Sequence, residues 1–133
     1  MNIESSAWVA ILLLEPAQEA LRAAIRRDPI RLCSAVNVLE VSMVMESRRG
    51  PGAVLEFQRD LRDLDVTVVP VDAPLAWAAL DAFRTYGKSR HPAGLNFGDC
   101  FSYALSKVTG QPLLFVGEDF ARTDIKAAAW KPS

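Results

Sequence analysis

The chain has 133 residues, half of them hydrophobic, and a formal net charge of −1. This length fits one domain whose apolar core is large enough to fold without disulfides or structural zinc. The near-neutral charge excludes a global positive field that attracts nucleic acid, so any such binding must use a local patch.

The start of the chain carries an apolar run over residues 7–14, and Glu4 rather than a basic residue precedes it. The run is too short to span a bilayer and lacks the charged start of a signal peptide. The two cysteines, Cys33 and Cys100, form no CxxC motif or Cys/His cluster, which excludes a zinc site by spacing and indicates a reducing compartment. We therefore expect a soluble cytoplasmic protein with no membrane contact.

The first half of the chain predicts strands and helices in alternation. In chain order, these are a strand over residues 1–3, helices over 7–14 and 17–27, a strand over 31–34, and helices over 35–48 and 53–64. Ser5 or Ser6 can cap the first helix, and Ser34 can cap the third. The clearest break in the chain is the Gly-Pro-Gly sequence that begins at Gly50.

The second half continues the alternation. The expected elements are a strand over residues 66–71, a helix over 73–86, a polar loop over 87–95, a helix over 98–109, a strand over 112–116 and a last short strand over 128–130. The run over 66–71 is rich in valine, which is typical of a strand covered on both faces. Gly110 is suited to a left-handed cap at the end of its helix.

Strands that alternate with helices favour an α/β fold, with a central, mostly parallel sheet flanked by helices and joined by right-handed crossovers. No repeat, low-complexity tract or linker divides the chain. We therefore expect one domain over residues 1–133.

Four acids follow the ends of predicted strands or begin helices: Glu4, Glu40, Asp99 and Asp119. The carboxyl ends of parallel strands face one crevice, so these side chains can meet. At an effective dielectric near 20, each pair of carboxylates about 5 Å apart costs roughly 3 kcal/mol. A divalent cation relieves this repulsion, and oxygen ligands suit Mg²⁺ or Mn²⁺. The pattern indicates phosphoryl-transfer chemistry.

Glu40 is the most telling of these acids. On a helical wheel it falls inside an apolar stripe, between Leu39 and Met43 on one side and Val44 on the other. A buried carboxylate without a partner is costly. Glu40 is therefore a functional acid, unless it forms a core salt bridge with an arginine or the helix tilts to expose it.

Asp99 and Asp119 each have a competing interpretation. Asn96 and Asp99 have the spacing of a capping box, in which Asn96 is the N-cap and Asp99 lies at the third helical position. A cap and a cation ligand are compatible roles. Asp119 competes with Asp124 for the place of the fourth acid.

Several strings in the chain resemble the PIN domain of VapC-type toxins. They begin at Ile3 (IESSA), Ser34 (SAV), His91 (HPA), Leu95 (LNFGDC) and Leu113 (LLF), and the last continues as GEDFARTDI from Gly117. The resemblance covers nearly the whole chain in order and spacing, and its LNFGDC and DFARTDI strings are specific.

The resemblance implies a metal-dependent endoribonuclease and toxin that uses Mg²⁺ or Mn²⁺ and is neutralised by a cognate VapB-like antitoxin. The family's acidic quartet falls on Glu4, Glu40, Asp99 and Asp119, its small hydroxyl residue on Ser6, and its asparagine near the third acid on Asn96. It also implies a homodimer, and promoter binding only through the antitoxin.

One residue departs from the family pattern, because the first acid is normally aspartate and here is Glu4. The extra methylene moves the carboxylate by about 1.5 Å, and Mg²⁺ demands near-ideal geometry. Three alternative explanations are open for the glutamate at position 4: a shifted metal preference, a weakened site or an engineered change. The alternative function is therefore a catalytically weakened module that acts by binding antitoxin or RNA.

The expected substrate is single-stranded or loop RNA, because an exposed backbone enters a crevice that a duplex cannot. Arg84, Lys88 and Arg90 are candidate phosphate contacts. A phosphorylated receiver domain also gathers acids at strand ends, but it needs a late lysine at the site, and Lys126 is poorly placed for that role.

Overall fold

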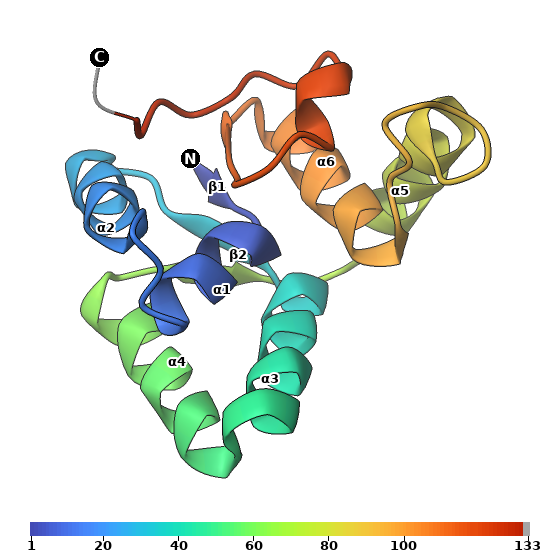
Figure 1. Ribbon diagram of the computed structural model, residues 1–133. Coiled ribbons are helices and arrows are strands. Elements are labelled where there is room, and N and C mark those ends of the chain that lie inside the picture. The colour runs from blue at the N-terminus through green and yellow to red at the C-terminus, as the bar shows by residue number, and fades with distance from the viewer. Residues whose placement is uncertain (132–133) are drawn as a thin grey trace.

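Four parallel strands form the centre of the computed structural model, which describes residues 1–131 (Figure 1). Their order across the sheet is β3–β2–β1–β4, and every pair of neighbours is parallel. The predicted α/β fold is therefore confirmed. The last two residues of the predicted domain, 132 and 133, lie outside the described residues.

The helices and strands follow the alternation seen in the sequence. Their bounds are β1 (Asn2–Ile3), α1 (Ser5–Leu12), α2 (Gln18–Arg27), β2 (Leu32–Ser34), α3 (Ala35–Arg49), α4 (Pro51–Asp63), β3 (Thr67–Val69), α5 (Ala73–Tyr86), α6 (Phe97–Thr109), β4 (Leu113–Leu114) and the 3₁₀ helix η1 (Phe120–Arg122). Within residues 1–131, no helix is long and apolar enough to cross a membrane.

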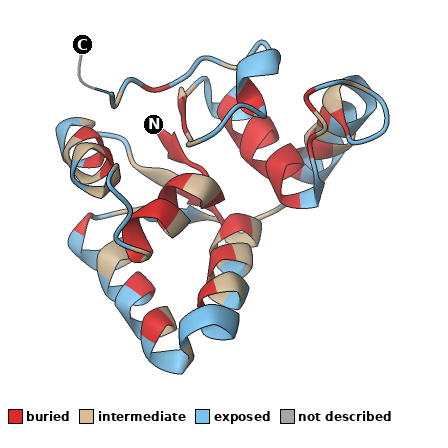
Figure 2. Ribbon diagram, viewed as in Figure 1, coloured by how far each residue is buried: buried red, intermediate tan, exposed pale blue. Residues whose placement is uncertain are grey.

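Side chains of the strands alternate between two apolar cores, one on each face of the sheet. Ile3, Cys33 and Leu114 pack in the core formed with α1, α2, α3 and α4. Leu113 and the half-buried Leu32 pack in the other core, formed with α5 and α6. Burial is concentrated on β1 and on the inner sides of the helices (Figure 2). A sheet covered on both faces is what a parallel arrangement requires.

The strand expected over residues 66–71, with both faces covered, is β3, a short strand at the edge of the sheet. Val68 is 40 % exposed. The prediction of burial on both faces was wrong because an apolar run does not state a strand's place in the sheet. That place depends on the strand order, which pairs β3 with β2 alone.

The predicted helix caps are largely correct. Ser34 accepts a hydrogen bond from Asn37 N (3.1 Å) and caps α3, and Gly110 ends α6 with a left-handed φ of 72°. The cap of α1 is an exception, because Glu4, not Ser5 or Ser6, is its N-cap. The Glu4 carboxylate accepts from Ser6 N at 2.7 Å, and the helix starts two residues earlier than expected.

The core-facing side of α3 differs from the predicted apolar stripe. Leu39 and Met43 are 60 % and 61 % exposed, while Val41 and Met45 are buried. The helical wheel gives the angles between residues of α3 correctly, but it cannot show which side of the helix packs against the core. Glu40 is half-buried between the two sides, so it lies at a cleft rather than inside the core.

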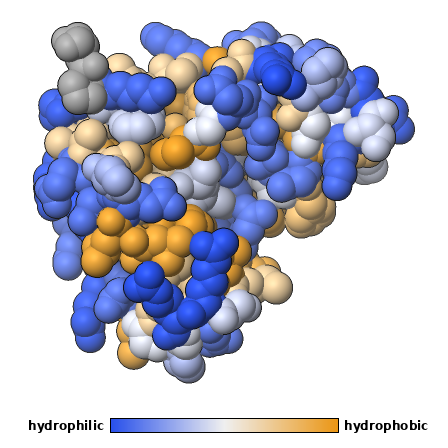
Figure 3. Space-filling view, viewed as in Figure 1, coloured by the Kyte–Doolittle hydropathy of each residue, from blue (hydrophilic) through white to orange (hydrophobic). Residues whose placement is uncertain are grey.

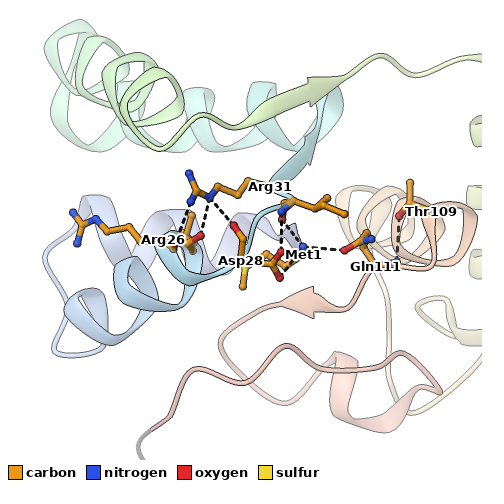
Figure 4. Close-up of polar contacts among 8 residues, drawn as sticks. Met1, Arg26, Asp28, Arg31, Thr109 and Gln111 are labelled. Carbon is orange, nitrogen blue, oxygen red and sulfur yellow. Dashed lines mark hydrogen bonds and ion pairs between the residues drawn. The ribbon is translucent and has the colours of Figure 1, made fainter.

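Arg31 and the Met1 amino group fix the segment that leads from α2 into β2 (Figure 4). Arg31 donates to the carbonyl oxygens of Ile25, Arg26, Asp28 and Leu64 at 2.7–2.9 Å. The Met1 amino group donates to Ile30 O and Gln111 Oε1 and pairs with Asp28. These contacts hold β2 beside β1, which places the start of α3 next to the end of β1.

The described part of the chain after β4 returns to lie beside that strand, parallel to it, without forming another strand. Leu113 bridges Ala127, and Ala128 N donates to Leu113 O at 2.8 Å. The expected strand over residues 128–130 is therefore not formed, and the single bridge beside it lies at Ala127. The expected strand over 112–116 is likewise shorter, at two residues.

Candidate active site

The four predicted acids line one pocket of about 310 Å³. Glu4 follows β1, Glu40 lies on α3, Asp99 on α6, and Asp119 just before η1. The parallel sheet brings them together, as the topology predicted, because β1 and β4 end at the same edge. The predicted supporting residues Ser6 and Asn96 line the same pocket.

Glu4 is the most buried of the four acids, at 3 % exposure. Its burial, together with the charges of Asp99 and Glu40, raises its pKa from 4.5 to about 7, although hydrogen bonding from Ser6 partly opposes this shift. The Ser6 hydroxyl accepts from Val116 N at 2.9 Å, which ties α1 to the segment after β4. Glu4 thus carries a carboxyl group that is poorly solvated and close to other negative charges.

Asp99 combines a structural role with a place in the pocket. Its backbone N donates to Asn96 Oδ1 (2.9 Å), and its Oδ2 accepts from Asn96 N (3.0 Å), so the predicted capping box is confirmed. Burial and the charges of Asp119 and Glu40 raise the pKa of Asp99 to about 6 from 3.8. Both roles predicted for Asp99 are geometrically compatible.

Glu40 is held by a buried polar chain that the sequence did not reveal. Ser5 Oγ donates to Glu40 Oε1 at 2.5 Å, and Asn37 Nδ2 donates to Ser5 Oγ at 3.0 Å. Asn37 also donates to Gly98 O, and Ser34 Oγ donates to Asn37 Oδ1. The available signal in the sequence was the polar Asn37, which lies one turn before Glu40 on the same predicted helix.

The structure separates the two candidates for the fourth acid. Asp119 is exposed and lines the acidic pocket. Asp124 accepts hydrogen bonds from Lys107 Nζ, at 2.8 Å, and from the Tyr103 hydroxyl. These contacts hold the pKa of Asp124 below its ordinary value. Asp124 is therefore a salt-bridged surface residue.

None of the four acids forms an ion pair with a basic residue within the described part of the chain. The charged side chains of the pocket that could bind a metal are carboxylates, whose oxygen atoms are the ligands that Mg²⁺ and Mn²⁺ prefer. Among residues 1–131, however, no three His, Cys, Asp or Glu side chains are arranged to hold one ion. The carboxylate oxygens are chemically suited to such an ion. One of these carboxylates, that of Glu4, accepts a hydrogen bond from Ser6 N at the start of α1.

The predicted phosphate contacts lie away from this pocket. Arg84 pairs with Asp81, Arg90 stacks over the Phe83 ring at 4.8 Å, and Lys88 is exposed in the following loop. None of the three lines the pocket. The basic residue that does is Arg48, in the last turn of α3, two turns after Glu40 and on the same side of the helix.

Residues 1–126 match the family model of the PIN domain. A Ribonuclease VapC from Mycolicibacterium smegmatis is 53 % identical over 127 residues, which cover 96 % of this chain and 98 % of that protein. Ribonuclease VapC30 from Mycobacterium tuberculosis is 51 % identical over 129 residues, covering 97 % and 98 %. The chain therefore belongs to the PIN domain family.

Within that family the chain groups with the VapC ribonucleases, as the sequence motifs predicted. A crystal structure of VapC20 from Mycobacterium tuberculosis, a toxin described as cleaving the Sarcin-Ricin loop, has a TM-score of 0.76. It is 17 % identical and covers 93 % of this chain and 95 % of that one. This likeness independently supports the fold.

Proposed function

We propose that the protein is a metal-dependent endoribonuclease and the toxin of a type II toxin–antitoxin system. The observation that carries the proposal is the acidic pocket, which four carboxylates line without an ion-pair partner among the described residues. The names of the relatives support ribonuclease activity. RNA is the substrate class we infer, with single-stranded or loop regions preferred.

Glu4 and Asp99 are the main candidates to hold Mg²⁺ or Mn²⁺, with Glu40 and Asp119 completing the set. Such an ion supplies Lewis-acid activation of the scissile phosphate and of the attacking water. Asn96 orients Asp99 through the capping box. The raised pKa values of Glu4 and Asp99 express the repulsion and desolvation that a bound cation offsets.

The RNA backbone needs positive charge near these acids. Arg48 lines the pocket and is our first candidate for a phosphate contact. Arg84, Lys88 and Arg90 remain candidates for contacts farther along the strand. Replacing Arg48 by alanine is expected to raise KM for RNA more than replacing Arg84, and steady-state cleavage of a labelled RNA compares the two.

The central experiment is RNA cleavage with Mg²⁺ or Mn²⁺, with and without EDTA. Asp99→Asn should abolish cleavage, while Asp124→Asn, which alters an acid outside the pocket, should preserve it. Cleavage that persists in EDTA, or in the Asp99→Asn variant, would refute the metal mechanism.

The alternative is a weakened PIN module that acts by binding antitoxin or RNA. The contact that favours it is the Glu4 carboxylate, which accepts from Ser6 N at 2.7 Å and so is partly committed to capping α1. Glu4→Asp separates the two functions. A large gain in cleavage would indicate an impaired native site, whereas robust and unchanged cleavage would exclude this alternative.

We also propose a VapB-like antitoxin partner, a homodimer and a cytoplasmic location, with promoter DNA bound only through the antitoxin. An apolar area over α1 and the loop after it suits the antitoxin (Figure 3). Leu14, in that loop, is exposed. Exposed Leu39, Met43 and Phe97 suit self-association, and Met43→Glu should yield monomers in light scattering.

A further inference from the structure

The Glu40 carboxylate packs directly on the Cα of Gly98. A methyl group added at Gly98 would lie 2.3 Å from Glu40 Oε2 and 2.6 Å from Oε1. Ordinary van der Waals contact at such a carbon begins at 3.4 Å. The carboxylate therefore occupies the space that any side chain at position 98 would fill.

The backbone on the other side of this contact is held in place. The capping box between Asn96 and Asp99 fixes the first turn of α6 around Gly98. Asn37 Nδ2 donates to Gly98 O at 3.2 Å from the neighbouring helix. Because the backbone has these three hydrogen bonds and the glutamate side chain is flexible, the carboxylate is the part that would move.

Glu40 is held from its other side by a directed hydrogen bond. The Asn37 amide nitrogen can only donate, so Ser5 Oγ accepts from it and gives its single proton to Glu40 Oε1, at 2.5 Å. The amide itself is oriented by Ser34, whose hydroxyl donates to Asn37 Oδ1. Asn37 thus forms hydrogen bonds with both residues that contact the Glu40 carboxylate, Ser5 and Gly98.

We propose that Gly98 is a positioning residue for Glu40, and that its missing side chain lets the carboxylate lie between the first turn of α6 and Ser5. Gly98→Ala must displace the carboxylate by at least about 1 Å to restore ordinary contact. The hydrogen bond to Ser5 is already 2.5 Å long, so the carboxylate cannot move toward Ser5 and must swing sideways out of this bond. The consequence for metal binding rests on the proposed function, whereas the displacement itself does not.

The test is a double-mutant cycle of Gly98→Ala and Glu40→Ala, read out by direct titration with Mn²⁺. In the native background, Gly98→Ala should weaken Mn²⁺ binding about tenfold, the usual effect of losing a ligand's supporting contact. In the Glu40→Ala background it should have little effect. Equal losses in both backgrounds would show a general structural role for Gly98 and overturn the proposal.

Gly52→Ala is the matched control, because a methyl group there meets nothing within 4 Å; it should leave Mn²⁺ affinity unchanged. If Gly98→Ala alone fails to fold, adding Glu40→Ala should restore folding, and failure of both variants would count against the proposal.

A crystal structure of Gly98→Ala grown in EDTA decides the displacement without any metal. We expect Glu40 beyond hydrogen-bonding distance of Ser5 with the backbone of residues 96–99 unchanged. A carboxylate that stays bonded to Ser5 would refute the inference. Absence of Mn²⁺ binding and of RNA cleavage in the native protein would refute only the proposed function.

Discussion

Replacing Glu4 by glutamine is expected to stabilise the metal-free protein at alkaline pH. Burial, with the nearby charges of Asp99 and Glu40, raises the pKa of Glu4 from 4.5 to about 7. Between pH 4.5 and about pH 7, Glu4 keeps its proton in the folded protein but has lost it in the unfolded chain. The free energy of unfolding therefore falls as pH rises through this window and levels off above it.

The size of the effect follows from that difference in pKa. It corresponds to about 3 kcal/mol of lost stability above pH 7. Glutamine offers Ser6 N a neutral acceptor, as the protonated glutamate does, and the stronger hydrogen bond to the charged form is already included in the pKa of Glu4. Glu4→Gln should therefore gain about 3 kcal/mol at pH 8, or about 9 °C in Tm, and almost nothing near pH 4.

Urea unfolding in EDTA across this pH range measures the difference. Glu15→Gln, which neutralises an exposed glutamate just after α1, is the control and should change little at either pH. Adding Mn²⁺ should stabilise the native protein more than the variant, because ligand binding to the folded state alone raises stability. A variant less stable than the native protein at pH 8 would refute the reasoning.

Three further outcomes are expected. Asp119→Asn should reduce single-turnover RNA cleavage by at least about tenfold, whereas Asp124→Asn, at a surface ion pair, should leave it nearly unchanged and cost at most about 1 kcal/mol in urea unfolding. Arg31→Lys should lower the free energy of unfolding by about 2 kcal/mol, because an ammonium group cannot serve the four carbonyls that the guanidinium contacts. Gly110→Ala, at a left-handed φ of 72°, should lower Tm through a cost of about 1 kcal/mol, while Gly52→Ala should not.

The motif that carries Asp99 was predictable because its interactions are local. The capping box joins residues three apart, and its geometry follows from a helix start alone. The same holds for Ser34 and Gly110. Glu4 shows the limit of such reasoning, because three consecutive polar residues offer three possible caps, and only the pairing of β1 decides where α1 begins.

The sequence by itself determined the fold class, the caps of α3 and α6, and Glu4, Glu40 and Asp99 as candidate acids, since each depends on residue type and on spacing of a few residues. The tertiary structure decided that β3 is an edge strand, that Leu39 and Met43 face outward, and that Asp124 lies outside the pocket. It also decided the contact between Gly98 and Glu40. The physical reason is that these features depend on strand order and helix rotation, which are set by packing between segments far apart in the chain.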